Sequence, residues 1–210
     1  MKNLFITFEG IDGCGKSTQS KLLYKKLSET SLDTILTEEP GGTPGANEIR
    51  KLLLRENNFT WSAETEVLLF MAARNDHVEK KIKPALEKDH IVICDRFIDS
   101  TLVYQGMRSD LAKKVCLSLY DLIGQVPSLT FLIDMNPKQA LERALSRKNN
   151  EDRFENYGVH FQTRVRKTFL KMAEENPGRI VVLEGSSDRD QLANDVFSHV
   201  EKHINSKISN

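Results

Sequence analysis

The glycine-rich segment GIDGCGKS at residues 10–17 restricts the fold of this chain more than any other feature. It follows a short apolar run and precedes a helical pattern, so it forms a complete G-x-x-x-x-G-K-S/T phosphate-binding loop, or P-loop. Glycines let the backbone turn tightly and direct successive N–H groups at phosphate oxygens, and the following helix adds its positive dipole end. The segment therefore predicts a site for the phosphates of a nucleotide.

Two polar side chains of the P-loop predict how these phosphates are held. Lys16 is expected to reach the β- and γ-phosphates of ATP, and the Ser17 hydroxyl is expected to ligate Mg²⁺ as the cofactor. The predicted ATP-binding residues are Gly10, Ile11, Asp12, Gly13, Cys14, Gly15, Lys16, Ser17 and Thr18.

Short apolar runs alternate with longer helical patterns along the chain. Strands are expected at residues 4–9, 34–37, 91–95, 130–134 and 180–183, and helices at 16–29, 44–55, 62–83, 110–124, 137–147, 157–175 and 188–204. The strands are continuously apolar, which is typical of a parallel sheet covered by helices, with ligands at the carboxyl ends of its strands. Residues 1–210 are expected to form one α/β domain.

Composition excludes several classes of protein. Thirty basic and thirty acidic residues give a formal net charge of +0, so neither nucleic acid nor an anionic membrane is expected as a partner. No apolar run approaches the roughly 20 residues of a membrane helix, and no signal peptide is recognised. The three cysteines have spacings that suit neither a disulfide framework nor a zinc site. We expect a cytoplasmic protein with small, buried thiols.

A P-loop also occurs in GTPase switches and in motor ATPases. A GTPase would carry D-x-x-G after a strand, and an N-K-x-D motif for guanine. Residues 121–124 spell DLIG, but they end an amphipathic pattern and so predict a helix terminus, and N-K-x-D does not occur. A DNA-binding ATPase would need a basic face or an added module. The GTPase and the DNA-binding ATPase are therefore both disfavoured.

A second polar motif follows the apolar run at residues 91–94. Asp95 would end a strand, face the P-loop and help to hold Mg²⁺, directly or through water. Arg96 suits the phosphate of an acceptor, because a guanidinium group binds phosphate in a bidentate way.

Together these motifs resemble the bacterial-type thymidylate kinases, from Phe5 to about Glu184. The resemblance implies a three-layer P-loop nucleotide kinase fold with a five-stranded parallel sheet, a lid at about 146–155 and a homodimer. It implies transfer of the γ-phosphoryl of MgATP to dTMP, giving dTDP and ADP for dTTP synthesis. A kinase for another monophosphate, such as dUMP or a guanine nucleotide, is the alternative. The motifs are the P-loop, EPGGT at 39–43, LFMAAR at 69–74, Asp95-Arg96, YQG at 104–106 and DRFE at 152–155.

Carried over by position, the resemblance also implies the contacts with dTMP. Phe70 would stack on thymine, and Arg74, on the same helix face, would donate to a base carbonyl. Tyr104 would crowd the 2′ position of the sugar, and Asp12 would reach its 3′-hydroxyl. The full predicted substrate set is Asp12, Glu39, Arg50, Phe70, Arg74, Arg96, Thr101, Tyr104 and Gln105.

Three members of this set complete the predicted site. Thr101 and Gln105 match positions at the polar edge of the pyrimidine, and Arg50 matches a second clamp on the acceptor phosphate. A plain surface role remains the alternative for Arg50 and Thr101. This chain has Glu38 where many family members carry arginine, and we expect its side chain to point outward, because Glu39 already occupies the acidic position of the family.

The variable P-loop positions are not basic, so another segment must supply the cation that bridges the transferring phosphoryl group. The predicted lid contains Arg153, the first candidate, and Arg147, the second. With Lys16, Arg96 and Asp95 they form the predicted catalytic set, and a solvated loop without a catalytic part is the alternative. The acceptor phosphate is already anionic, so no strong general base is required.

Overall fold

The structure, a computed structural model, describes residues 4–54, 60–146 and 157–208, with side chains as far as residue 205. In these residues the strands are β1 (Phe5–Glu9), β2 (Thr34–Glu38), β3 (Ile91–Asp95), β4 (Leu129–Asp134) and β5 (Ile180–Glu184). The helices are α1 (Lys16–Ser28), α2 (Pro44–Leu54), α3 (Ala63–His77), α4 (Lys83–Glu87), α5 (Ile98–Tyr104), α6 (Asp110–Ile123), α7 (Pro137–Leu145), α8 (Gly158–Glu175) and α9 (Arg189–Ile208).

The five strands form one parallel sheet in the order β2-β3-β1-β4-β5, which confirms the predicted α/β class. The central strand β1 lies between β3 and β4, and every residue of β1 and β3 is buried. Burial on both faces explains why these strands are continuously apolar, because each face must pack against helices.

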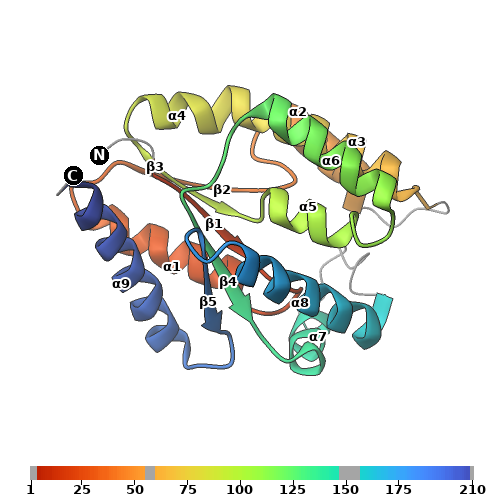
Figure 1. Cartoon of the computed structure of the whole chain (residues 1–210). Helices are drawn as coiled ribbons and strands as arrows, with labels where there is room; N and C mark the ends of the chain where they lie inside the picture. Colours follow the sequence, from red (N-terminus) through yellow and green to blue (C-terminus); the bar gives the residue numbers. More distant parts are fainter. Residues whose placement is uncertain (1–3, 55–59, 147–156, 209–210) are drawn as a thin grey trace.

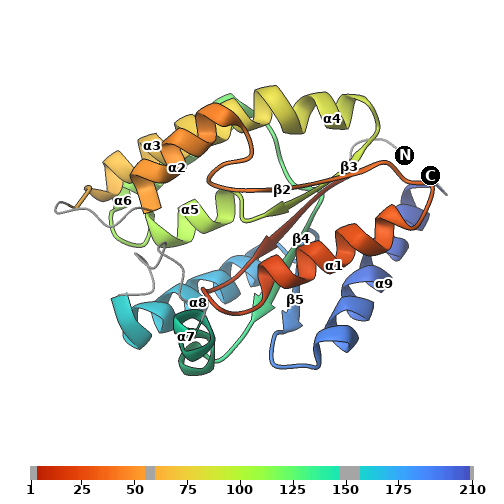
Figure 2. The same ribbon diagram turned by 180° about the vertical axis from the view of Figure 1, so that it is seen from behind.

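Two layers of helices cover the sheet. Phe5, Val92 and Cys94 pack against α3 and α6, whereas Ile6 and Phe8 pack in a second core with α1, α8 and α9. Figure 1 shows α2, α3, α4 and α6 gathered together, and Figure 2 shows α1 and α9 at a distance from them. None of the helices in the described ranges has the length and apolar character needed to cross a membrane.

Most predicted boundaries agree with the structure to within two residues, and three elements differ. Helix α5 was not predicted, because seven residues give too short a pattern for a 3.6-residue period to show. Pro84 lies in the first turn of α4, where its missing N–H is tolerated, and a π-helical turn at Val78–Ile82 joins α4 to α3. Helix α9 continues to Ile208, four residues beyond the expected end.

The parallel sheet brings three loops to one edge. The P-loop follows β1, the EPGGT segment follows β2, and Asp95-Arg96 ends β3. Gly13 of the P-loop has φ of 80°, and a Cβ atom there would lie 1.9 Å from the carbonyl oxygen of Ala140 on α7. Only glycine fits this close approach, so the backbone of the P-loop rests directly on α7.

Candidate active site

An open cleft of about 1040 Å³, its mouth included, lies at the carboxyl ends of β1, β2 and β3. Every predicted substrate residue lines it, although these residues come from five separate segments of the chain. Gly13, Lys16, Ser17 and Asp95 line the same cleft. The residues predicted for dTMP and those predicted for the phosphates of ATP thus share one site. The residues predicted for dTMP are Asp12, Glu39, Arg50, Phe70, Arg74, Arg96, Thr101, Tyr104 and Gln105.

Arg96 lines this cleft. Its backbone φ of 67° lies in the left-handed region. Its Nη2 donates to Asp12 Oδ1 of the P-loop, and its Nη1 donates to the Gly10 carbonyl at 3.1 Å and to Ser100 Oγ at 2.9 Å. Burial alone would lower the pKa of Arg96, but the carboxylate of Asp12 raises it, so the guanidinium stays charged.

Asp12 is held from several directions. The Tyr104 hydroxyl donates to its Oδ2 at 2.9 Å, and Gln162 Nε2 on α8 lies 3.4 Å from the same oxygen. Burial acts to raise the pKa of Asp12, but the charges of Arg96 and Lys16 outweigh it, so this pKa is lowered. Asp12 therefore stays ionised as a hydrogen-bond acceptor at the centre of the cleft.

Lys16 is a second cation that lines the cleft. It begins α1, is buried, and donates from Nζ to the Ile11 carbonyl at 2.8 Å, which keeps the amine over the P-loop. Cys14, within the P-loop, has a buried side chain, and burial raises the pKa of its thiol. The thiol is therefore neutral and fills space, as predicted, and Cys94 and Cys116 are likewise buried and free.

One wall of the cleft carries Phe70 and Arg74, one turn apart on α3. Arg74 is only 2% exposed; its Nε donates to Glu39 Oε2 at 2.7 Å, and its Nη2 donates to Thr101 Oγ1 at 3.1 Å. The other oxygen of Glu39 lies 2.9 Å from Nδ1 of His77. Glu39 thus holds Arg74 in place and uses both carboxylate oxygens within the protein.

Three buried residues were missed by the sequence analysis. His77 lies three residues after Arg74 on the same buried face, so a count of polar residues on that face could have found it. Glu66 is fully buried and accepts from Gln105 Nε2 at 3.0 Å and from Arg108 Nη1 at 2.6 Å. Glu9 is the last residue of β1. Its position after four buried residues was the only feature that could have identified it as a buried carboxylate near the site.

The metal prediction fits the residues present. Asp95 is 9% exposed and lines the cleft with Ser17, and its Oδ1 is buried without a hydrogen-bond partner among the described residues. A carboxylate oxygen with no donor suits a cation or the water bound to one. In the described ranges, no group of three or more His, Cys, Asp or Glu is placed so that it could hold a metal ion. Mg²⁺ usually takes only one or two protein ligands and completes its shell with phosphates and water.

Two other predictions have different outcomes. Glu38 was expected to point outward, and its side chain is 60% exposed, but it also lines the cleft, with Oε2 3.5 Å from Arg50 Nη1. The attraction of Arg50 explains this position, and Arg50 also donates to the Pro40 carbonyl at 2.7 Å. Arg147 and Arg153 of the predicted lid lie outside the described residues.

Comparisons with known proteins agree with this geometry. Residues 8–196 match the family model described as thymidylate kinase. Thymidylate kinases from Ruegeria pomeroyi and Dinoroseobacter shibae are 50% and 52% identical over 203 and 196 residues, which cover 96% and 93% of this chain and 96% and 95% of theirs. The crystal structure of thymidylate kinase from Ehrlichia chaffeensis has a TM-score of 0.76 and 37% identity, and the match covers 96% of this chain and 99% of that one. The chain belongs to the thymidylate kinase family.

Proposed function

We propose that the cleft binds dTMP with its base between Phe70 and Arg74 and its phosphate on Arg96, while the P-loop holds ATP. As a member of its family, the enzyme transfers the γ-phosphoryl of ATP to dTMP, giving dTDP and ADP. The assignment of individual residues is supported above all by one observation. Arg96 and Lys16, the two cations predicted for the two nucleotides, line a single cleft.

Phosphoryl transfer asks the protein for positioning and for neutralisation of charge. Lys16 would hold the β- and γ-phosphates, and Arg96 and Arg50 would hold the acceptor phosphate against electrostatic repulsion between the nucleotides. Mg²⁺ bound with ATP would neutralise phosphate charge, and Ser17 and Asp95 are the residues that would hold it. Arg153, with Arg147 second, would bring a further cation from the lid.

The base contacts follow from hydrogen-bond chemistry. Glu39 accepts from Arg74 Nε, Thr101 Oγ1 accepts from Nη2, and Met71 Sδ accepts from Nη1. Each Nη carries two hydrogens and Arg74 lines the cleft, so a carbonyl oxygen of thymine would accept from a further N–H of this guanidinium. Glu66 accepts from Gln105 Nε2, which orients the amide and leaves Oε1 as the acceptor for a ring N–H. Tyr104, whose hydroxyl donates to Asp12, would crowd a 2′-hydroxyl.

A coupled assay of ADP release tests the proposed specificity with Mg²⁺, ATP and a panel of dTMP, dUMP, dCMP and dGMP. We expect dTMP to be fastest and dCMP to be rejected, because the 4-amino group of cytosine would oppose the donors of Arg74. Similar rates for all four monophosphates would contradict the roles of Phe70, Arg74 and Gln105.

We also propose a single-domain enzyme that works in the cytoplasm as a homodimer. The support for the dimer is an apolar surface, which we call the leucine face: Leu52 on α2, Leu68 on α3, and Leu111 and Leu122 on α6 are all exposed. These three helices lie side by side (Figure 1). Leu111 and Leu122 are eleven residues apart, or about three turns, and so share one stripe of α6. A second copy of the chain is the proposed occupant of this face.

A further inference from the structure

A chain of hydrogen bonds runs beneath the cleft from Glu9 to Arg96 through Ser100. Ser100 Oγ lies 2.5 Å from Glu9 Oε2 and donates to it, and Arg96 Nη1 donates to the same Oγ from 2.9 Å. Glu9 Oε1 accepts from the backbone N–H of Phe97 at 2.8 Å and from that of Ser100 at 3.3 Å. One carboxylate therefore binds two backbone N–H groups in the segment that directly follows Arg96.

The direction of each bond in this chain follows from the groups available. An ionised carboxylate accepts only, and a guanidinium donates only, so the Ser100 hydroxyl must give its hydrogen to Glu9 and offer a lone pair to Arg96. Glu9 is 1% exposed, so water does not compete for these positions. The orientation of Arg96 Nη1 is thereby set by a residue on another strand.

The opposite edge of the guanidinium is held differently. Nη2 binds Asp12, which is the residue proposed for the sugar hydroxyl of dTMP. Asp12 can exchange this partner when a nucleotide binds, whereas Glu9 and Ser100 are held within the fold. The pair of Glu9 and Ser100 therefore supplies the fixed support, and the edge with Nη2 is the one available to a phosphate.

We propose that Glu9 is a positioning residue for phosphoryl transfer, which acts through Ser100 to aim the guanidinium of Arg96 at the phosphate of dTMP. The proposal rests on the role proposed above for Arg96. It assigns to Glu9 no contact with either nucleotide, because Glu9 does not line the cleft.

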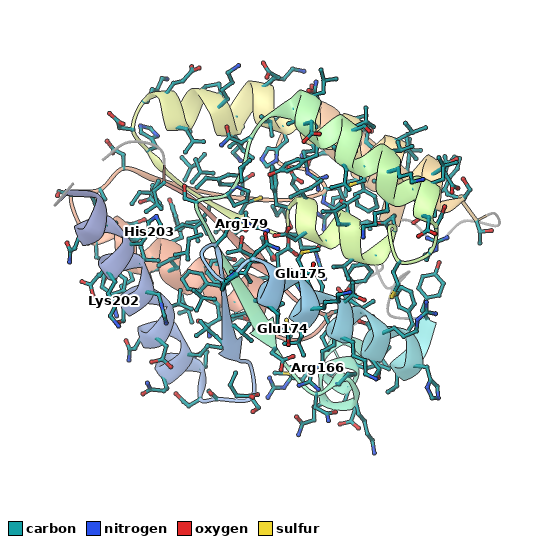
Figure 3. All side chains as sticks on the ribbon, in the orientation of Figure 1. Arg166, Glu174, Glu175, Arg179, Lys202 and His203 are labelled. Carbon is teal, nitrogen blue, oxygen red and sulfur yellow. The ribbon has the colours of Figure 1, made fainter. Side chains whose placement is uncertain are left out.

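The charges around Glu9 give the proposal a pH signature. Its carboxylate faces Asp99 on α5, Arg96 in the turn, Cys94 on β3 and Arg179 ahead of β5 (labelled in Figure 3). Burial, and then the charge of Asp99, raise the pKa of Glu9 to about 7, although Arg96 and the bonds from Ser100 and Phe97 act to lower it. A neutral carboxyl group no longer offers two acceptor oxygens. The hold of Glu9 on Ser100, and through it on Arg96, therefore weakens as the pH falls through 7.

The test compares Glu9→Gln, Ser100→Ala and the double variant by steady-state kinetics at pH 8. Glutamine keeps the size of Glu9 but places an NH₂ group where Oε2 accepted, so the hydroxyl of Ser100 loses its acceptor. We expect KM for dTMP to rise about tenfold in each single variant, the scale of one hydrogen bond to a charged group, with KM for ATP within about twofold of wild type. Because both residues act through one path, the double variant should be no worse than Glu9→Gln alone.

Three controls make the outcome decisive. Ser100→Thr keeps the hydroxyl and should recover most of the loss seen with alanine. Glu64→Gln removes another glutamate–serine bond, to Ser109, away from the cleft, and should leave KM for dTMP unchanged. Arg96→Lys tests the role of Arg96 itself. If Arg96→Lys has no effect, the proposed site is wrong; if it does and Glu9→Gln does not, only the present proposal is wrong.

A pH profile separates positioning from packing. The ratio of kcat/KM for dTMP between wild type and Glu9→Gln should be largest at pH 8 and fall toward 1 at pH 6. Ionisation of the dTMP phosphate, with a pKa of about 6, is common to both proteins and cancels in the ratio. A constant ratio, additive losses in the double variant, or equal changes in KM for dTMP and ATP would each overturn the proposal. Ser100→Ala keeps the test valid if Glu9→Gln fails to fold.

Discussion

Arg96 and Asp12 form an ion pair that joins the segment after β3 to the P-loop after β1. The two residues are 84 positions apart in the chain, and both side chains are about four-fifths buried. Because each of them is proposed to contact dTMP, substrate binding would exchange an internal pair for two contacts with one ligand.

Lys16→Ala should lower kcat by about 10²–10³-fold, the usual loss when one group that stabilises developing charge is removed. Among the described residues, the Lys16 amine donates to the P-loop carbonyl of Ile11 and to the Cys14 sulfur, and both partners lie in its own loop. Its loss should therefore change the melting temperature little. Stopped-flow or coupled kinetics, with thermal unfolding alongside, checks both parts. Full turnover in this variant would contradict the proposed phosphate site.

Glu39→Ala should lower the free energy of unfolding by about 3–5 kcal/mol, because it leaves the buried guanidinium of Arg74 without its carboxylate. It should also raise KM for dTMP, since Arg74 is no longer held. Urea unfolding measures the first effect. The matched control is Glu48→Ala, which breaks only the exposed pair with Lys51 and should change stability by less than about 1 kcal/mol. Equal effects of the two substitutions would contradict this account.

Glu9 should make stability depend on pH between about 4.5 and 7. Its pKa rises from 4.5 to about 7 on folding, so in this window the folded protein holds a proton that the unfolded chain has lost. The stabilisation is complete below pH 4.5 and is lost as the pH rises to 7, by an amount on the order of 3 kcal/mol. Glu9→Gln should gain stability relative to wild type between pH 5 and pH 8, as measured by urea unfolding. A difference that does not change with pH would exclude this titration.

Arg153→Ala should lower kcat by on the order of 10³-fold, the scale of an arginine that bridges a transferring phosphoryl group, with little change in KM for dTMP. Single-turnover kinetics separates the chemical step from binding. Lys148→Ala, in the same predicted lid, is the control and should have a much smaller effect. An unchanged kcat for Arg153→Ala would move the role to Arg147 or remove it from the lid.

Leu68→Glu combined with Leu122→Glu should convert a dimer to a monomer, because charges on the leucine face would be buried without partners in the interface. Sedimentation velocity gives the oligomeric state directly. Leu145→Glu alters a leucine that is similarly exposed on α7, outside the leucine face, and should leave the dimer intact. A wild-type protein that sediments as a monomer would contradict the proposed assembly.

The sequence predicted the strands, most helices, the P-loop and many of the residues that line the cleft, although not Phe97 or Ser100. Residues 121–124 illustrate why local patterns sufficed: the predicted helix terminus is confirmed, since α6 ends at Ile123 and Gly124 follows with φ of 68°. Apolar spacing, turn glycines and the Gly-Lys-Ser signature are properties of adjacent residues. The pairing of Glu38 with Arg50 was not predicted, because Arg50 reaches Glu38 from another element.

The order of neighbouring residues in the sequence thus determined the α/β architecture and the type of phosphate chemistry, because both depend on short-range backbone preferences. Only the tertiary structure decided which buried carboxylate supports which functional group. Glu9 with Ser100, Glu39 with Arg74, and Glu66 with Gln105 are separated by 91, 35 and 39 residues. A buried carboxylate must accept hydrogen bonds from whichever donors the fold places beside it, and no spacing in the sequence records that choice.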